Sequence, residues 1–269
     1  MSAVAMLDGV ALDLATLGIA QFVHHERVSS TMDVAHTLAA SGAPHGTLIV
    51  ADGQDVGRGR SGKRWHSAAP DGLWMTWLLR DVTVASLGVL SLRTGLAIAE
   101  AVAPHVDGLV GLKWPNDVLT ADACDVDAAR VQPWSSLGKL AGVLVETRWR
   151  DQSLDWVAIG IGINTRIPLD ADRESVLAGR RVAAVRAETP RATLLAALAR
   201  PLLALGAGAA TLSRTERAAW AARDVVVGRE ATSPARGVVV GVADDGALLL
   251  GDGAGQVTVH RSGSLELRD

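Results

Sequence analysis

The order of apolar and polar positions along the chain predicts two units of different character. Up to residue 222, apolar runs of strand length alternate with longer stretches whose apolar residues recur at helical spacing. From Asp224 onward, short Val-rich runs are separated by Gly-containing turns, which is typical of a compact β unit. We therefore predict an α+β fold with a larger domain over 1–222 and a small β domain over 223–269.

Within the larger domain, the pattern predicts both strands and helices. Strands are expected at 21–27, 47–51, 73–79, 109–114, 139–149 and 154–163. Helices are expected at 31–40, at 87–102 and twice between 189 and 222, and Ser30 begins the first of them with a capping box. The segment 120–136 is polar and rich in acids, so we predict a loop there and assign it no function.

Composition limits the classes of protein to which the chain can belong. Of its 269 residues 49% are hydrophobic, as in a packed globular protein. The single cysteine, Cys124, excludes an internal disulfide framework and fits a reducing compartment. No stretch approaches the roughly eighteen uncharged apolar residues of a membrane span, and Asp8 and Asp13 stand where a signal peptide would be basic and apolar. We therefore expect a cytoplasmic protein with no membrane partner.

The segment 57–65, Gly-Arg-Gly-Arg-Ser-Gly-Lys-Arg-Trp, is the strongest chemical signal in the chain. Its first eight residues contain three glycines, four cations and no acid, a combination that indicates anion binding. Two phosphate-loop patterns, G-x-G-x-x-G and G-x-x-x-x-G-K, match this segment, but both need a helix at the last glycine, and a turn at 70–72 follows instead. A net charge of −3 and the lack of a second basic cluster argue against nucleic-acid binding.

Further segments place polar side chains at the ends of predicted elements. They are Ser30-Thr31 with Gln54, Lys113-Trp114-Pro115-Asn116-Asp117, Gly138-Lys139-Leu140-Ala141-Gly142 and Gly160-Ile161-Gly162-Ile163-Asn164. Taken singly, each has a structural interpretation: a helix cap, an Asx turn, a solvated lysine where a strand begins, and a turn asparagine. Together with the glycine loop, in this order and spacing, they resemble the biotin protein ligases over residues 21–166.

The resemblance implies an enzyme, an ATP-dependent and AMP-forming biotin–[biotin carboxyl-carrier protein] ligase. Such a ligase activates biotin as biotinyl-5′-AMP and transfers it to a lysine of the biotin carboxyl carrier protein domain of an acyl-CoA carboxylase. The implied fold is a class II synthetase-like catalytic domain, with a mixed central sheet and flanking helices, followed by an SH3-like β-barrel domain. Biotin and ATP are then the ligands, Mg²⁺ arrives on ATP with no protein ligand assigned, and a homodimer is left open.

The resemblance also implies roles for the residues at matching positions. Biotin contacts are expected from Ser30, Thr31, Gln54, Gly57, Arg58, Gly59, Arg60, Lys139 and Gly142. Contacts with ATP or the adenylate are expected from Arg60, Lys63, Trp65, Lys113, Asn116, Lys139 and Asn164. The catalytic set is Arg60 and Lys113, which stabilise charge at the α-phosphate, and Asp117, which takes up a proton from the attacking lysine.

Within these sets the expected tasks differ. The hydroxyl groups of Ser30 and Thr31 and the amide of Gln54 are expected to hydrogen-bond the ureido ring of biotin. The loop 53–64 is expected to close as a lid over the hydrolysable adenylate. Trp65 is expected to pack beneath this loop rather than to stack on adenine.

Three departures from the family pattern and three alternatives accompany this interpretation. Met32 stands where the family has asparagine, Lys63 where it has arginine, and the segment 120–136 is longer than the expected hairpin. A lipoyl or octanoyl transferase of the same fold would need no ATP, and a catalytically weak biotin-binding regulator would release no pyrophosphate. A biotin-sensing repressor is disfavoured, because residues 1–20 are too few for an N-terminal helix-turn-helix.

Overall fold

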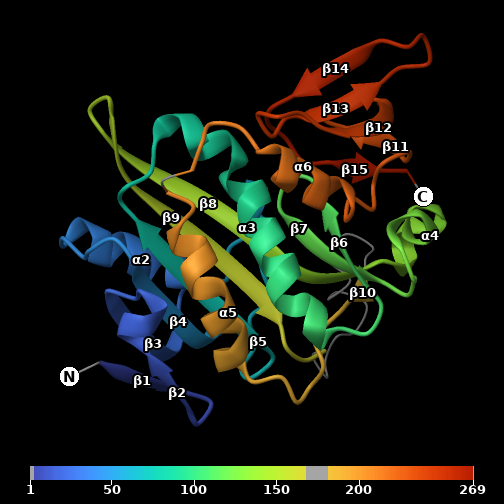
Figure 1. Ribbon diagram of the computed structural model, residues 1–269. Helices are drawn as coiled ribbons and strands as arrows, with labels where there is room; N and C mark the ends of the chain where they lie inside the picture. The colour runs from blue at the N-terminus through green and yellow to red at the C-terminus, as the bar shows by residue number, and fades with distance from the viewer. Residues whose placement is uncertain (1–2, 168–180, 207, 269) are drawn as a thin grey trace.

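A mixed β-sheet forms the centre of the protein, whose computed structural model describes residues 3–167, 181–206 and 208–268 (Figure 1). The sheet has eight strands in the order β3-β4-β5-β9-β8-β7-β6, and β10 pairs with β8 off this path. They are β3 (Gln21–Val28), β4 (Thr47–Gln54), β5 (Gly72–Leu79), β6 (Leu109–Lys113), β7 (Asp117–Ala121), β8 (Gly138–Arg150), β9 (Ser153–Asn164) and β10 (Arg181–Val182). Two pairs, β3 with β4 and β8 with β10, are parallel, and the rest are antiparallel. The mixed central sheet expected from the sequence is confirmed.

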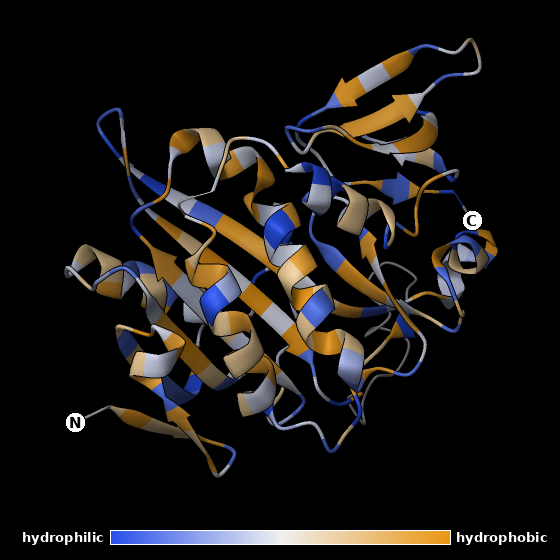
Figure 2. Cartoon of the chain, viewed as in Figure 1, coloured by the Kyte–Doolittle hydropathy of each residue, from blue (hydrophilic) through white to orange (hydrophobic). Residues whose placement is uncertain are grey.

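Helices cover both faces of this sheet. The helices α3 (Leu87–Val102) and α5 (Arg191–Leu203) lie in front of it in Figure 1, and Figure 2 shows hydrophobic residues along the strands behind them. The helix α2 (Thr31–Ala40) packs on β4, β5 and β9. Along β4, Leu48 and Val50 join the core under α3 and α5, whereas Ile49 between them packs with α2. Since successive side chains of a strand point to opposite faces, α2 covers the face opposite to α3 and α5.

Short elements complete the larger domain. A hairpin of β1 (Val4–Leu7) and β2 (Val10–Asp13) precedes α1 (Leu14–Leu17) at the N-terminal end. Single 3₁₀ turns are η1 (Arg60–Gly62), η2 (Val84–Ser86), η3 (Ala103–His105) and η4 (Trp134–Ser136). The Arg191 guanidinium joins the N-terminal hairpin to the sheet, because it lies 2.6 Å from Asp8 Oδ1 and 2.8 Å from Asp52 Oδ1. Both carboxyl groups have pKa values below their usual range; the Arg191 hydrogen bond is the largest cause for Asp8, and for Asp52 the hydrogen bonds from His24 and Arg191 outweigh desolvation.

The helix α3 owes its apolar composition to its place in the core. The stretch Val84–His105, which contains α3, is the one helix among the described residues with the length and hydropathy to cross a membrane, and 56% of its most apolar window is buried. Arg93, in the middle of the helix, is also buried and donates from Nε to Glu216 Oε1 at 2.6 Å. It also donates to the carbonyl oxygens of Ala209 and Thr211. The helix is thus tied by a buried cation to the segment that begins α6 (Arg214–Ala221).

The predicted loop over 120–136 was wrong in part. The strand β7 extends through its start, and the helix α4 (Val126–Val131) lies within it. Asp125 caps this helix by accepting a hydrogen bond from Ala128 N at 2.8 Å. The short helix was not predicted from the sequence, because acidic residues are common both at the caps of helices and in loops.

A second sheet follows α6 and forms the C-terminal domain, at the upper right of Figure 1. It is antiparallel, with the order β14-β13-β12-β11-β15. Its strands are β11 (Glu230–Ser233), β12 (Gly237–Val242), β13 (Leu248–Gly251), β14 (Val257–His260) and β15 (Glu266–Leu267). The predicted β unit is confirmed as an antiparallel sheet, in which β14 and β15 are the outer strands of the hydrogen-bonded ladder.

The connection between the two domains is buried and hydrogen-bonded. Leu112 of β6 donates to Arg223 O at 2.7 Å and accepts from Val225 N at 3.2 Å. Between them, Asp224 is almost fully buried, and its carboxylate accepts from Trp220 Nε1 and Val226 N, each at 3.1 Å. Burial raises the pKa of Asp224 from 3.8 to about 6. The boundary predicted at 222/223 thus falls next to a segment that pairs with β6, and it stays a prediction.

Asp224 is expected to make stability depend on pH. Because its pKa is raised in the folded state, its contribution is fully present below pH 3.8 and is lost as pH rises through about 6. The loss amounts to about 3 kcal/mol of unfolding free energy. Urea unfolding of the wild type and of Asp224→Asn should therefore be measured at pH 4 and at pH 7. The unfolding free energy of the wild type, relative to that of Asp224→Asn, should fall by about this amount between the two pH values. A difference between the wild type and Asp224→Asn that stays constant from pH 4 to pH 7 would contradict the assignment.

Candidate active site

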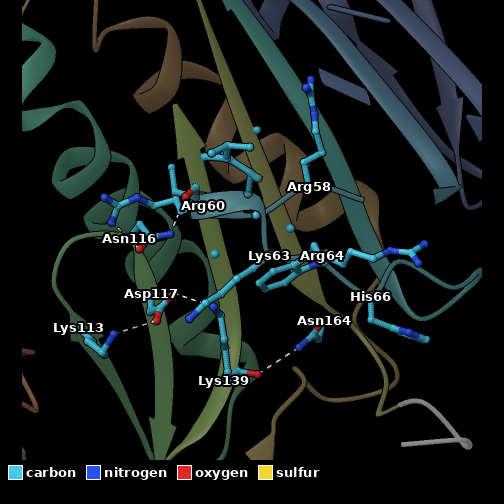
Figure 3. A pocket seen from close by; sticks show the side chains of 18 of the residues that line it. Arg58, Arg60, Lys63, Arg64, His66, Lys113, Asn116, Asp117, Lys139 and Asn164 are labelled. Atoms are coloured by element: carbon cyan, nitrogen blue, oxygen red, sulfur yellow. Dashed lines mark hydrogen bonds and ion pairs between the residues drawn. The ribbon is translucent and has the colours of Figure 1, made fainter. Parts of the chain in front are cut away.

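A cavity of about 660 Å³ lies beside the glycine loop and is lined by residues of β5, β8, β9 and the C-terminal domain; Figure 3 shows part of this lining. Every site residue predicted from the sequence lines it except Gly57. Gly57 is buried at the base of the loop, where an added Cβ would lie 2.4 Å from Trp65 O and 2.6 Å from Ser67 Oγ. Its role in the structure is therefore to let the two arms of the loop approach each other.

One end of the cavity is cationic and organised by a single carboxylate. Asp117 Oδ1 lies 2.7 Å from Lys139 Nζ, and Asp117 Oδ2 lies 3.4 Å from Lys113 Nζ. The register of the sheet brings them together, since Asp117 faces Lys113 across the β6–β7 hairpin and Gly142 across the β7–β8 pair. Lys113 and Asp117 are buried. The two ammonium groups are therefore held in place before any ligand arrives.

The turn that joins β6 to β7 is fixed by its neighbours. Asn116 Nδ2 donates to Val143 O at 2.8 Å, and Val143 N donates back to Asn116 O at 3.0 Å. Trp114 is buried and donates from Nε1 to Gly246 O of the C-terminal domain at 2.9 Å. These contacts fix the direction of Lys113, which directly precedes the turn.

Arg60 reaches the same end of the cavity from the loop. It donates from Nη2 to Gly263 O at 2.9 Å and from Nη1 to Asn116 Oδ1 at 3.4 Å. Desolvation lowers the pKa of this guanidinium, and the charge of Asp117 acts in the opposite sense. Both hydrogen-bond acceptors are neutral, so they orient the cation without neutralising it. A partly desolvated cation of this kind favours the approach of an anion.

A second part of the cavity lining, its polar end, carries a network of neutral polar groups. Gln54 Oε1 accepts from Thr31 N at 2.8 Å and from Thr31 Oγ1 at 3.2 Å, and Gln54 Nε2 donates to Ser67 Oγ at 2.8 Å. Thr76 Oγ1 donates to Thr31 Oγ1 at 2.8 Å. Ser30 begins α2, as predicted, by accepting from Met32 N at 3.3 Å, but the predicted capping box was wrong, because Asp33 Oδ2 accepts from Ser29 Oγ at 3.1 Å instead. These bonds fix the Gln54 amide and the Thr31 hydroxyl at the N-terminus of α2.

Trp65 lies on a floor of glycines, as expected for a residue that packs beneath the loop. A Cβ on Gly142 would lie 2.7 Å from its ring, and one on Gly162 would lie 2.6 Å from its Nε1. Lys139 Nζ lies 4.9 Å from the centroid of the same ring, and Trp74 meets its edge. Gly142 therefore acts here by making room for the indole that supports the loop.

Two other predicted residues have their side chains engaged elsewhere, and a third is exposed. Arg58 Nη2 lies 2.9 Å from Asp33 Oδ1 and 3.5 Å from Glu146 Oε2, and Figure 3 shows it directed away from the lysines. Asn164 Nδ2 donates to Lys139 O and to a second backbone carbonyl. Lys63 is exposed on the cavity wall. The roles predicted for these side chains stay predictions.

Several lining residues were missed from the sequence. Gly160, Gly162 and Met32 form part of the floor; an added Cβ on Gly160 would lie 2.8 Å from Met32 Sδ. The alternation of glycines at 160 and 162 was a signal for them. Five residues of the C-terminal domain also line the cavity, namely Thr232, Ser264, Leu265, Glu266 and Leu267. No local signal could have found these. Among the described residues, no group of three or more His, Cys, Asp or Glu side chains could hold a metal ion.

Comparisons with known proteins agree with this geometry. A 35% identical relative over 143 residues is the bifunctional ligase/repressor BirA of Bacillus subtilis, with 53% of this chain and 39% of that protein covered. The biotin–[acetyl-CoA-carboxylase] ligase of Mycobacterium tuberculosis is 36% identical over 144 residues, with 51% and 47% covered. The chain thus spans less than half the length of these two relatives.

The fold has a match among solved structures, and the sequence matches a family profile. The biotin protein ligase of Aquifex aeolicus, in complex with biotin and ATP, superposes with a TM-score of 0.67 at 23% identity, over 93% of this chain and 99% of that one. This likeness shows the fold. The profile of the biotin/lipoate A/B protein ligase family matches residues 24–164, which is just over half of the 269 residues and includes the loop and both lysine segments. The chain belongs to the biotin/lipoate A/B protein ligase family.

Proposed function

We propose that the chain is an ATP-dependent ligase that activates biotin as biotinyl-5′-AMP and transfers it to a lysine of a biotin carboxyl carrier protein domain. The observation that carries the proposal is the group of three cations around one carboxylate at one end of the cavity. These residues are Arg60, Lys113, Lys139 and Asp117. The names of the Mycobacterium tuberculosis and Aquifex aeolicus proteins support biotin and ATP as ligands.

The cationic end suits the first half-reaction, which joins two anions. The biotin carboxylate must attack the α-phosphate, and two unit charges about 4 Å apart repel by roughly 4 kcal/mol at an effective dielectric near 20. Lys139 and Lys113 share Asp117, so neither ammonium must be reoriented when charge develops in the transition state. Arg60 adds a cation whose hydrogen-bond partners are neutral. We therefore assign the biotin carboxylate to Lys139 and the α-phosphate to Lys113 and Arg60.

The polar end suits the ureido ring, which offers one acceptor and two N–H donors. Thr31 and Gln54 present a hydroxyl and an amide whose orientations are fixed by hydrogen bonds. The cavity thus offers both a polar end and a cationic end to a ligand with a polar ring, an apolar chain and a carboxylate. Magnesium would enter bound to the triphosphate and would offset the phosphate charge.

The second half-reaction needs a neutral amine. A lysine of pKa about 10.4 is neutral only about once in a few thousand molecules at pH 7. We assign Asp117 as the group that accepts the proton from the attacking lysine. In the free protein both of its carboxylate oxygens lie near ammonium groups, so this role requires Lys113 and Lys139 to engage the adenylate first.

Mass spectrometry of a carrier domain after incubation with the protein, biotin, ATP and magnesium tests the proposal. The carrier should gain the mass of one biotinyl group, and a carrier with its acceptor lysine changed to arginine should not. Product formed without ATP would point to a transferase, and product formed only with lipoate would change the substrate. No product and no release of pyrophosphate would overturn the proposed function.

Three further assignments stay predictions alongside this proposal. They are a cytoplasmic location, the absence of a nucleic-acid partner, and an assembly that is left open between monomer and homodimer. The name of the Bacillus subtilis relative includes a repressor function. Gel-shift assays with DNA and sedimentation of the purified chain would test the second and third.

A further inference from the structure

The C-terminal domain contributes to the cavity through a turn that contacts Arg60. The turn precedes β15, and its Gly263 carbonyl accepts the hydrogen bond from Arg60 Nη2 at 2.9 Å. This bond is shorter than the one from Arg60 Nη1 to Asn116, which measures 3.4 Å. The neighbouring residues Ser264 and Leu265 line the cavity wall. The guanidinium is therefore oriented by a peptide group that lies 203 positions further along the chain.

The backbone conformation of Gly263 is one that other residues rarely adopt. Its φ is +116°, and a Cβ at this position would lie 3.1 Å from Pro234 Cβ. Any side chain here strains the turn and presses on β11–β12, so the direction of the carbonyl depends on the glycine. The hydrogen bond to Arg60 thus depends on a single position of the C-terminal domain.

The domain is held against the same hairpin that carries Lys113. Trp114 donates to Gly246 O, and Leu112 pairs with Arg223 and Val225 at the connection between the domains. The loop of Arg60 needs such support, because much of it is exposed and Ser61 and Gly62 have positive φ values of 55° and 73°. Arg60 thus contacts the C-terminal domain directly, and the hairpin that carries Lys113 is joined to it through Trp114.

We propose that Gly263 is a positioning residue, whose carbonyl holds the Arg60 guanidinium toward the phosphate end of the cavity, so that docking of the C-terminal domain sets the rate of adenylate formation. The proposal rests on the proposed function of Arg60. A neutral carbonyl suits this task, since a carboxylate in its place would neutralise the cation before the nucleotide arrived.

The variant Gly263→Ala tests the proposal, with Gly255→Ala as a matched control. Gly255 has a positive φ of 83° in another turn of the same domain, and nothing lies within 4 Å of an added Cβ. Both variants should melt slightly below the wild type. Biotin-dependent exchange of pyrophosphate into ATP should lose about 10- to 100-fold in kcat for Gly263→Ala only, with little change in KM for biotin. An equal loss in both variants, or none in either, would overturn the positioning role.

A double-mutant cycle distinguishes positioning from a general structural effect. Single-turnover formation of the adenylate would be measured in Arg60→Ala with and without Gly263→Ala. If Gly263 acts through Arg60, the second change should cost nothing further. A full additional loss would overturn the proposal. Pyrophosphate exchange by the wild type is measured first, and its absence would rule out the proposed function. If the wild type exchanges normally and the effects of the two substitutions add, only the role of Gly263 is ruled out.

Discussion

Replacing Lys113 by methionine is expected to lower the rate of biotinyl-adenylate formation by about 10²- to 10³-fold. The ammonium is buried beside Asp117 in the lining of the cavity. A fixed cation there stabilises the negative charge that grows on the α-phosphate, and its removal leaves Asp117 its ion pair with Lys139. Methionine keeps most of the apolar volume of the side chain, so the surrounding strands should stay packed. Rapid-quench measurement of adenylate at saturating ATP gives the rate.

The affinity for biotin should change only a few-fold in this variant, because we assign the biotin carboxylate to Lys139 and not to Lys113. Lys63→Met is the matched control, since it makes the same exchange at an exposed position of the same cavity. Its effect should be smaller, because solvent screens an exposed charge. A Lys113→Met defect confined to biotin affinity, with a normal adenylation rate, would contradict the assigned role.

Hydrophobic periodicity was sufficient to predict most of the fold. The strands β5, β8 and β9 and the helix α3 have long apolar patterns, and the structure places them within a residue or two of the predicted bounds. The same pattern could not show how the strands pair. The contact of Asp117 with Lys113 and Lys139 depends on the β6–β7 and β7–β8 registers, and no local feature of the sequence encodes the second of these.

The site was predictable where its chemistry is local and not where it is assembled through space. Charge and glycine content alone identified the loop of Arg60, and the resemblance then assigned the lysines. The support of Arg60 by Gly263 and the packing of Trp65 on Gly162 involve residues far apart in the chain. Arg58 shows the converse: it belongs to the same cationic run, yet its guanidinium pairs with Asp33 and Glu146. Two arginines of the same cationic run therefore need not lie in the same part of the site.

Replacing Arg60 by alanine is expected to weaken retention of biotinyl-5′-AMP by about 10²-fold or more, as for loss of a charge-assisted hydrogen bond at a partly desolvated anion. Stability should fall little, by less than about 1 kcal/mol, because both partners of Arg60 are neutral groups that water can reach once the side chain is gone. Stopped-flow dissociation of the adenylate and thermal melting of the same samples measure the two effects. The role of Arg60 is tested by comparing the fold-change in the dissociation rate of the adenylate with the loss of stability.

Arg64→Ala is the matched control for Arg60→Ala, because Arg64 belongs to the same loop and donates to the backbone oxygen of Asp55 at 2.6 Å. Figure 3 shows its side chain directed away from the lysines and Asp117. If cation content alone mattered, the two variants would release the adenylate at similar rates, since each removes one positive charge from the loop. If orientation matters, only Arg60→Ala should release it faster. Equal release, or a loss of stability in Arg60→Ala as large as its loss of retention, would show that Arg60 supports the loop rather than the intermediate.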